Sequence, residues 1–270
     1  MKDQPFRELE ITEYSGESEK KQRQHSDHIA SEVPVALVFN EISHAVLMAT
    51  PENLIEFAMG FSFTEGIISH PEEVFGTEIV SSDAGIEVQL SLSGERFNYL
   101  KERRRNLVGR TGCGICGAES LQQIRLPHGP VSSDLTISHE AVIRATGQLA
   151  SKQAVQEKTG AVHGAAWCNT SGEIELLYED VGRHNALDKL IGSLLLQGRL
   201  KEAGFLLISS RASYEMLQKA AMANIAIVVA VSAATTMAVE IAEEAGICLL
   251  GFSRGSRHVV YSHDQRLEQD

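Results

Sequence analysis

The chain has 270 residues, enough for one large domain or two moderate ones, and 43% of them are hydrophobic, so it can bury a core. Its net charge of −12 excludes general nucleic-acid binding, because that activity needs a basic surface. The polar N-terminus lacks a secretory apolar stretch, and the longest apolar run, Ile225–Val231, is too short to cross a membrane. A cytoplasmic protein is therefore expected.

The first 126 residues divide into two predicted segments. Residues 1–30 are rich in Glu, Lys, Gln, Ser and His, a composition typical of a loosely ordered tail. Residues 31–126 are predicted to form a smaller α+β domain. Its expected elements are strands at 34–39 and 42–48, a helix opened by Thr50–Pro51 and ended by Gly66, strands at 79–80 and 86–92, and a helix at 95–105.

Residues 127–270 alternate helices with short apolar strands, which predicts an α/β domain. Several of its strands are unbroken runs of Leu, Ile and Val, as in parallel strands that are buried on both faces. After a linker at 127–133, the expected elements are helices at 138–150, 183–196, 213–222 and 235–245, a hairpin of 162–167 with 174–178, and strands at 205–208, 225–231, 247–252 and 259–261.

Serine, threonine and arginine gather where three of these strands end. In an open parallel sheet, ligands bind outside the carboxyl ends of the strands, and both helix N-termini and guanidinium groups bind phosphate. The pattern therefore predicts a phosphate or nucleotide site, with ordinary helix capping as the alternative. A Walker loop is absent and none of these strand ends carries a G-x-G-x-x-G motif, which argues against an ordinary NTPase or dehydrogenase. The residues concerned are Ser209–Ser213 with Arg211, Ser232–Thr236, and Ser253–Arg257 with Arg254 and Arg257.

Cys113 and Cys116 stand three apart in a glycine-rich run, which predicts an exposed loop. Such a pair supports half of a zinc site, a dithiol redox couple or a sulfur-carrying thiolate. Zinc needs further ligands, and Cys168, Cys248 and His163 would have to reach the loop through folding. Thioredoxin-like chemistry expects the pair at a helix N-terminus. A sulfur carrier needs an exposed, mobile thiol of low pKa, which the glycines and nearby arginines favour.

A third polar group stands at the start of the helix predicted at 183–196. Acidic and basic side chains there either form an ordinary polar helix face or point toward the ligand edge of the sheet. His163 is expected to be packed or paired rather than to bind a metal. The residues of this group are Glu179, Asp180, Arg183, His184 and Asp188.

Eight longer motifs follow one another between about residues 30 and 265. They are Glu32–Val38, Phe57–Ile68, Lys101–Arg105, Arg110–Gly117, Glu179–Lys189, Ser209–Met216, Ala230–Thr236 and Gly251–Arg257. Together they resemble the formate dehydrogenase accessory sulfurtransferase family. The resemblance implies a sulfurtransferase that relays persulfide sulfur from a cysteine desulfurase to the molybdenum or tungsten bis-molybdopterin guanine dinucleotide cofactor, as formate dehydrogenase requires. A non-catalytic chaperone for the cofactor is the alternative.

The resemblance also assigns residues. Cys113 maps to the persulfide carrier and Cys116 to its supporting partner. The cofactor-contacting segment maps to one of the three strand ends, and the neighbouring turns add Arg211 and Ser232. The mapped segment consists of Phe252, Ser253, Arg254, Gly255, Ser256 and Arg257.

The resemblance further implies a cytidine-deaminase-like, three-layer fold for the C-terminal domain, and a homodimer. Deaminases place a glutamate two residues after a histidine beside their zinc, and Val162–Ala165 lacks it, so neither deaminase chemistry nor a bound metal is expected. The molybdenum cofactor is then cargo. The expected partners are the cysteine desulfurase and formate dehydrogenase, with no nucleic acid and no membrane insertion.

Overall fold

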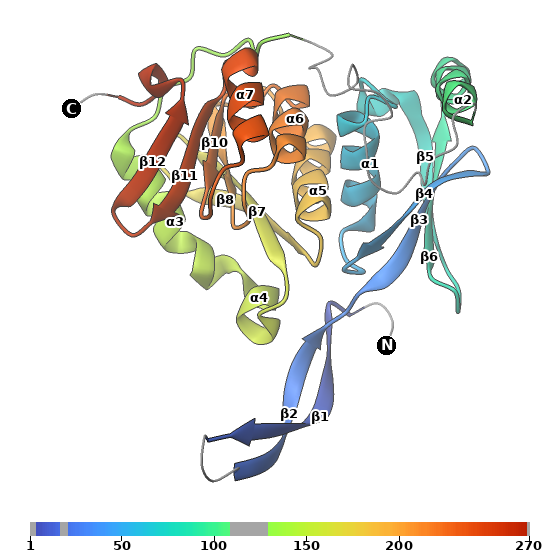
Figure 1. Cartoon of the computed structure of the whole chain (residues 1–270). Helices are drawn as coiled ribbons and strands as arrows, with labels where there is room; N and C mark the ends of the chain where they lie inside the picture. Colours follow the sequence, from blue (N-terminus) through green and yellow to red (C-terminus); the bar gives the residue numbers. More distant parts are fainter. Residues whose placement is uncertain (1–3, 17–20, 109–128, 269–270) are drawn as a thin grey trace.

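The computed structural model describes residues 4–16, 21–108 and 129–268 (Figure 1). The predicted cysteine loop, with Cys113 and Cys116, lies outside these ranges. Within them the chain has a mixed α/β architecture, as predicted, with two sheets in its body and a separate two-stranded hairpin.

The larger sheet has the strand order β12-β11-β10-β9-β7-β8. The unbroken apolar runs in β9, β10 and β11 predicted parallel strands, and these three are parallel to one another. The outer strands are antiparallel to their neighbours, so the sheet is mixed. Its strands are β7 (His163–Asn169), β8 (Ile174–Asp180), β9 (Gly204–Ile208), β10 (Ile227–Ala230), β11 (Cys248–Arg254) and β12 (Arg257–Ser262).

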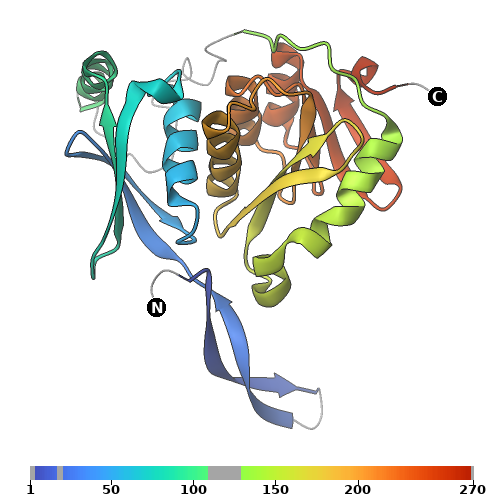
Figure 2. The same ribbon diagram turned by 180° about the vertical axis from the view of Figure 1, so that it is seen from behind.

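Helices cover both faces of this sheet, with α5, α6 and α7 on one face and α3 on the other (Figures 1 and 2). Ser138 and Thr235 cap α3 and α7 by accepting hydrogen bonds from the backbone N–H groups of Ala141 and Ala238. The sequence did not predict the six-residue helix α4. The helices are α3 (His139–Lys152), α4 (Ala154–Thr159), α5 (Arg183–Leu196), α6 (Tyr214–Met222) and α7 (Thr236–Ala245).

The N-terminal part of the body has its own four-stranded sheet, in the order β4-β3-β6-β5, and its own hydrophobic core around Phe39 and Phe57. The predicted hairpin of β3 with β4 is confirmed. The boundary between the predicted domains falls in residues 109–128, outside the described ranges. The elements are β3 (Val33–Phe39), β4 (Ile42–Ala49), α1 (Leu54–Thr64), the short 3₁₀ turn η1 (Pro71–Glu73), β5 (Val74–Ser81), β6 (Ile86–Leu92) and α2 (Gly94–Val108).

The predicted start of α1 was wrong. Its N-cap is Asn53, in the left-handed conformation, rather than Thr50. Thr50 is 1% exposed. Its backbone N–H donates to the Asp180 carboxylate at 3.0 Å, and its hydroxyl accepts from the Val181 N–H. Thr50 therefore does not cap the helix, as the local sequence suggested. It is instead hydrogen-bonded to the last residue of β8 and to the residue that follows it.

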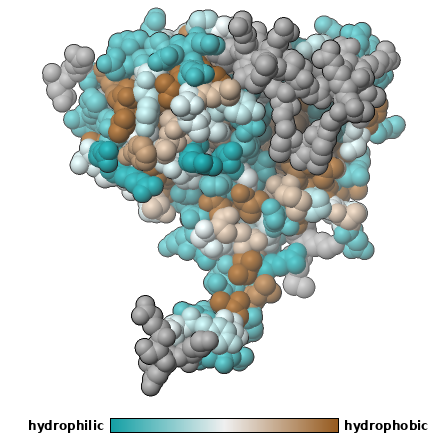
Figure 3. Space-filling model, in the orientation of Figure 1, coloured by the Kyte–Doolittle hydropathy of each residue, from teal (hydrophilic) through white to brown (hydrophobic). Residues whose placement is uncertain are grey.

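The prediction of a loosely ordered tail was also wrong for most of residues 1–30. Strands β1 (Phe6–Ser15) and β2 (Lys21–Ala30) pair antiparallel along their length. The hairpin projects from the body (Figure 1), and hydrophobic surface lies near its base (Figure 3). At that base the Lys158 ammonium of α4 lies 4.6 Å from the centre of the Phe6 ring. Cross-strand pairing orders these polar strands although they contribute little to a core.

Candidate functional site

Strand direction brings one set of polar residues to a single edge of the larger sheet. The carboxyl ends of β9, β10 and β11 meet at this edge because the three strands are parallel. β7 is antiparallel to both β8 and β9, so the end of β8 and the start of β7 lie at the same edge. We call this the strand-end edge. It includes Ile208, Ala230 and Arg254 as the last residues of the three parallel strands.

The three polar turns predicted to meet at this edge do contact one another. The Ala212 N–H donates to the Ala233 carbonyl and the Thr235 N–H donates to the Ala212 carbonyl, each at 3.0 Å. The Phe252 N–H donates to the Ser232 carbonyl, also at 3.0 Å. The backbone thus fixes the spacing of the turns, and Arg211 is an exposed side chain on the first of them.

The mapped segment 252–257 is a hairpin end rather than a helix start. β11 continues to Arg254, and Gly255–Ser256 turns the chain into β12. Phe252 has a φ of 50° and a side chain that is 41% exposed. A non-glycine residue in this left-handed region is unusual and occurs often at functional sites.

Side chains of this segment point in different directions. Arg254 and Arg257 are exposed, and the Arg254 Nε donates to the Val231 carbonyl at 3.1 Å. Ser253 is only 2% exposed, and its hydroxyl lies 2.9 Å from that of Thr146 in α3. Ser253 therefore faces α3, whereas Arg254 and Arg257 remain accessible to a ligand.

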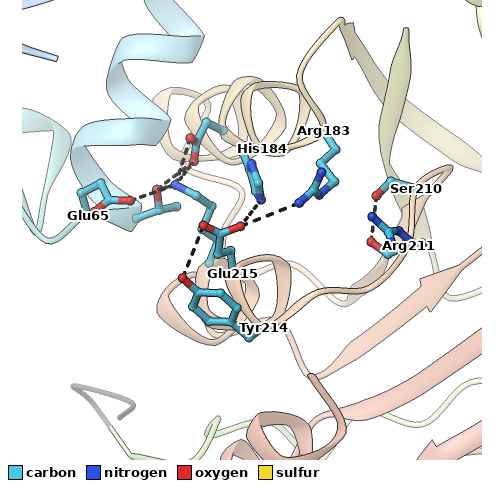
Figure 4. A network of polar contacts seen from close by, with 10 residues as sticks. Glu65, Arg183, His184, Ser210, Arg211, Tyr214 and Glu215 are labelled. Carbon is cyan, nitrogen blue, oxygen red and sulfur yellow. Dashed lines mark hydrogen bonds and ion pairs between the residues drawn. The ribbon is translucent and has the colours of Figure 1, made fainter. Parts of the chain in front are cut away.

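An ionic cluster lies beside these turns, at the starts of α5 and α6 (Figure 4). The Glu215 carboxylate is 2.6 Å from His184 Nε2 and 3.9 Å from Arg183 Nη2. The hydrogen bond from His184 lowers the pKa of Glu215 below its ordinary value, and the charges of His184, Arg183 and Lys219 act in the same direction, although partial burial opposes them. The sequence pointed to Arg183 and His184 but not to Glu215, which is recognisable only as an acid in the first turn of α6.

Replacing Glu215 by glutamine is expected to destabilise the protein at neutral pH and to have progressively less effect as the pH falls below 4.5. Since the folded-state pKa is depressed, the carboxylate contributes stability above its ordinary pKa of 4.5, and this contribution is lost as the pH falls through the folded value. Urea unfolding of both proteins across this range measures the difference, and an exposed Glu240→Gln variant is the control. A difference that stays constant with pH contradicts the assignment.

Two acidic residues of the Glu179–Lys189 motif are buried and form ion pairs inside the protein. Asp180 is 0% exposed and lies 2.7 Å from Lys189 Nζ, which is also fully buried. Asp188 is 1% exposed and accepts hydrogen bonds from Lys219 and Thr64. Arg183 and His184 therefore fit the interpretation that this group points toward the ligand edge of the sheet. Asp180 and Asp188 do not.

Cys168 and Cys248 are buried in β7 and β11, with two strands between them. Burial raises the pKa of both thiols, that of Cys248 to about 12, so neither is a ready thiolate. Partial burial lowers the pKa of His163, and the nearby charge of Arg183 lowers it further. The described residues contain no group of three or more side chains suited to binding a metal ion.

In the described ranges, no helix has both the length and the apolar character needed to cross a membrane.

The chain is similar to known proteins in sequence and in fold. The FdhD/NarQ family model matches residues 30–268. Over 245 residues the chain is 51% identical to the sulfur carrier protein FdhD of Cupriavidus necator, an alignment that covers 90% of this chain and 85% of that protein. The fold is similar to the crystal structure of a Desulfotalea psychrophila protein described as a formate dehydrogenase accessory protein, with a TM-score of 0.74 over 97% of this chain and 99% of that one. Sequence identity to that protein is 23%, so this likeness concerns the fold alone.

Proposed function

Because this chain belongs to the FdhD/NarQ family, we propose that it is a sulfur carrier that serves formate dehydrogenase. Cys113 carries the sulfur as a persulfide, and Cys116 supports it. The observation that carries this proposal is the 51% identity, over 90% of the chain, to a protein named as a sulfur carrier. The molybdenum or tungsten bis-molybdopterin guanine dinucleotide cofactor is the acceptor, and a cysteine desulfurase is the donor.

The strand-end edge supports the cofactor part of the proposal. Arg211, Arg254 and Arg257 are all exposed on turns that belong to this edge. A guanidinium group can donate two parallel hydrogen bonds to the oxygens of one phosphate, so these three arginines suit the diphosphates of a dinucleotide. The exposed ring of Phe252 offers a surface on which a heterocyclic base can stack.

The loading step is a thiol–persulfide exchange. The Cys113 thiolate attacks the outer sulfur of the donor's persulfide, a new S–S bond forms on Cys113, and the donor's cysteine leaves as a thiolate. The reaction involves no net oxidation or reduction. It requires an exposed thiol of lowered pKa, which the arginine-rich sequence before Cys113 favours.

Mass spectrometry of the intact protein tests this function after incubation with a cysteine desulfurase and cysteine. The wild-type protein is expected to gain one sulfur atom, and Cys113→Ala is expected to lose this adduct completely. Cys248→Ala is the matched control and should retain it, since that thiol is buried. If neither the wild type nor the control gains sulfur, the chain is not a carrier, and a non-catalytic cofactor chaperone becomes the better account.

A further inference from the structure

Two histidines join α3 to the edge strand β12. His139 Nδ1 lies 2.7 Å from His258 Nε2, and the two rings are stacked, with their centres 4.9 Å apart and their planes 12° from parallel. His139 is the first residue of α3, and His258 is the second residue of β12. Both side chains are partly buried, so the contact is partly shielded from solvent.

This pair lies next to the mapped segment 252–257. His258 follows Arg257 directly in β12, and Arg257 is opposite Arg254 in β11. Both arginines are exposed at this end of the β11–β12 hairpin. The position of their two guanidinium groups therefore depends on what holds β12 in place.

A second contact joins the same helix to the same hairpin. The Thr146 hydroxyl lies 2.9 Å from the hydroxyl of Ser253 in β11. Thr146 follows His139 by about two helical turns, so the two residues lie on one face of α3. Helix α3 therefore contacts the β11–β12 hairpin at two points, and of these only the histidine contact can gain a charge near neutral pH.

The surroundings of His258 favour a neutral pair. Its Nδ1 is buried and has no hydrogen-bond partner among the described residues. A neutral pair carries two N–H protons. We assign one to His258 Nε2, which then donates to His139 Nδ1, and the other to His139 Nε2. One further proton would have to go to His258 Nδ1, where it would become a buried donor without an acceptor, which costs free energy.

A doubly charged pair cannot keep the contact. All four ring nitrogens then carry hydrogen, so the two nitrogens of the bridge would direct their N–H groups at each other, and two cations would touch. Burial lowers the pKa of His258, and the charge of His139 lowers it further. Because the separated rings bind protons with the ordinary pKa of 6.5, opening of the contact becomes more favourable as the pH falls below 6.5.

The other charged and titratable groups around the pair do not replace this interaction. Besides burial, His139 is the group whose charge shifts the pKa of His258. Arg266 donates to three backbone carbonyls, and the glutamates of α7 lie on the opposite face of the sheet from α3 (Figures 1 and 2). The groups on the elements nearest the pair are Glu140 in α3, Arg254 in β11, Arg257 in β12, and His263, Asp264, Arg266 and Glu268 after β12.

We propose that His139 and His258 form a pH-sensitive latch. While both rings are neutral, their hydrogen bond holds the start of α3 against β12. As the pH falls below neutral, uptake of protons opens this contact and releases the hairpin end that carries Arg254 and Arg257. The latch does not depend on sulfur transfer or on a cofactor, so either proposal can fail without the other.

NMR of the imidazole C2–H groups of the full-length protein tests the latch between about pH 5 and pH 8. The two signals are identified by their loss in His139→Asn and in His258→Gln. In the wild type, both signals are expected to follow the same steps, because protonation of one ring alters the other. The midpoint of His258 is expected to lie below 6.5. Independent titration of the two rings, with both midpoints at or above 6.5, contradicts the latch.

Hydrogen exchange of the β12 backbone amides measures the opening itself. For one histidine that is neutral in the closed state and has the ordinary pKa of 6.5 in the open state, opening should become about tenfold more frequent between pH 7.5 and pH 5.5. Protection factors, which correct for the effect of pH on intrinsic exchange, should fall by the same factor. The amides of β9, in the interior of the sheet, are the internal control and should not share this fall.

Two amide substitutions remove the titration and keep a neutral hydrogen bond. The side-chain amide of asparagine can take the place of histidine Nδ1, and that of glutamine can take the place of Nε2. In the double variant His139→Asn with His258→Gln, the protection of β12 is therefore expected not to change with pH. His70→Asn is the control, because it replaces an exposed histidine at the N-cap of η1 by another capping residue, and it should behave as the wild type does.

Two results of the exchange experiment overturn the proposal. One is a wild-type β12 whose protection does not change with pH, and the other is a double variant that loses protection at low pH as the wild type does. If the double variant lacks protection at both pH values, the amides do not restore the bridge, and the NMR titration of the wild type decides.

Discussion

Asp180→Ala is expected to lower the free energy of unfolding by about 3–5 kcal/mol, the usual effect of removing one partner of a buried ion pair. The Asp180 carboxylate accepts from Lys189 Nζ at 2.7 Å, from Asn185 Nδ2 at 2.9 Å and from the backbone N–H groups of Thr50 and Gly182. Without it, these four donors lose a partner and the Lys189 ammonium stays buried beside no counter-charge. Urea unfolding at pH 7 measures the loss.

The pH dependence of this loss distinguishes the ion pair from simple packing. Burial lowers the pKa of Lys189, and the charge of Asp180 opposes this effect. Removing Asp180 therefore lowers that pKa further, and a buried amine of depressed pKa destabilises the fold most below the pKa and less as the pH rises toward its ordinary 10.5. The destabilisation should thus be smaller at pH 9.5 than at pH 7. A loss that does not change with pH contradicts the ion-pair account.

Two controls complete this measurement. Glu244→Ala removes an exposed acid of α7 and is expected to change stability by less than about 0.5 kcal/mol. In the double variant Asp180→Ala with Lys189→Met, the loss should be smaller than the sum of the two single losses, because the second change removes the stranded charge.

Helix α5 shows what local sequence can predict. Its leucines recur at helical spacing, and the predicted bounds, Arg183–Leu196, are those of the structure. The strands β9, β10 and β11 were also predicted from their apolar runs, and the meeting of their polar ends followed from parallel direction alone. For both the helix and the strand ends, the signal lies within the elements themselves.

The features that the sequence did not predict depend on distant partners. Thr50 reads locally as a helix cap, yet its partner Asp180 is 130 residues away. Glu215 gains its role only when α6 meets α5. The β1–β2 hairpin has a polar composition that suggests disorder, and only the pairing of its two strands orders it. The cytidine-deaminase-like comparison and the homodimer remain predictions from the resemblance.

The contact of α1 with α5 joins the two parts of the body and depends on two glycines. A Cβ on Gly192 would lie 1.8 Å from the Glu56 carbonyl oxygen, and a Cβ on Gly60 would lie 1.8 Å from the Asp188 carbonyl oxygen. Both clashes are with backbone atoms of the facing helix, so no side-chain rotation can relieve them. The helices touch along their main chains and would have to move apart to admit even a methyl group.

Gly192→Ala is accordingly expected to lower the free energy of unfolding by about 3 kcal/mol, the upper part of the range for overpacked cores. The sign is opposite to that of an ordinary glycine-to-alanine change within a helix, which stabilises by about 0.5–1 kcal/mol. Gly147→Ala in α3 is the matched control, because its added methyl group meets no atom within 4 Å, and it should stabilise the protein.

The contact also places Thr64 Oγ1 2.8 Å from Asp188 Oδ1, so separating the helices stretches a buried hydrogen bond as well. Since one movement of the helices relieves both clashes, Gly60→Ala combined with Gly192→Ala should destabilise by less than the sum of the single changes. Equal effects of Gly192→Ala and Gly147→Ala in thermal or urea unfolding would show that the helices are not in main-chain contact.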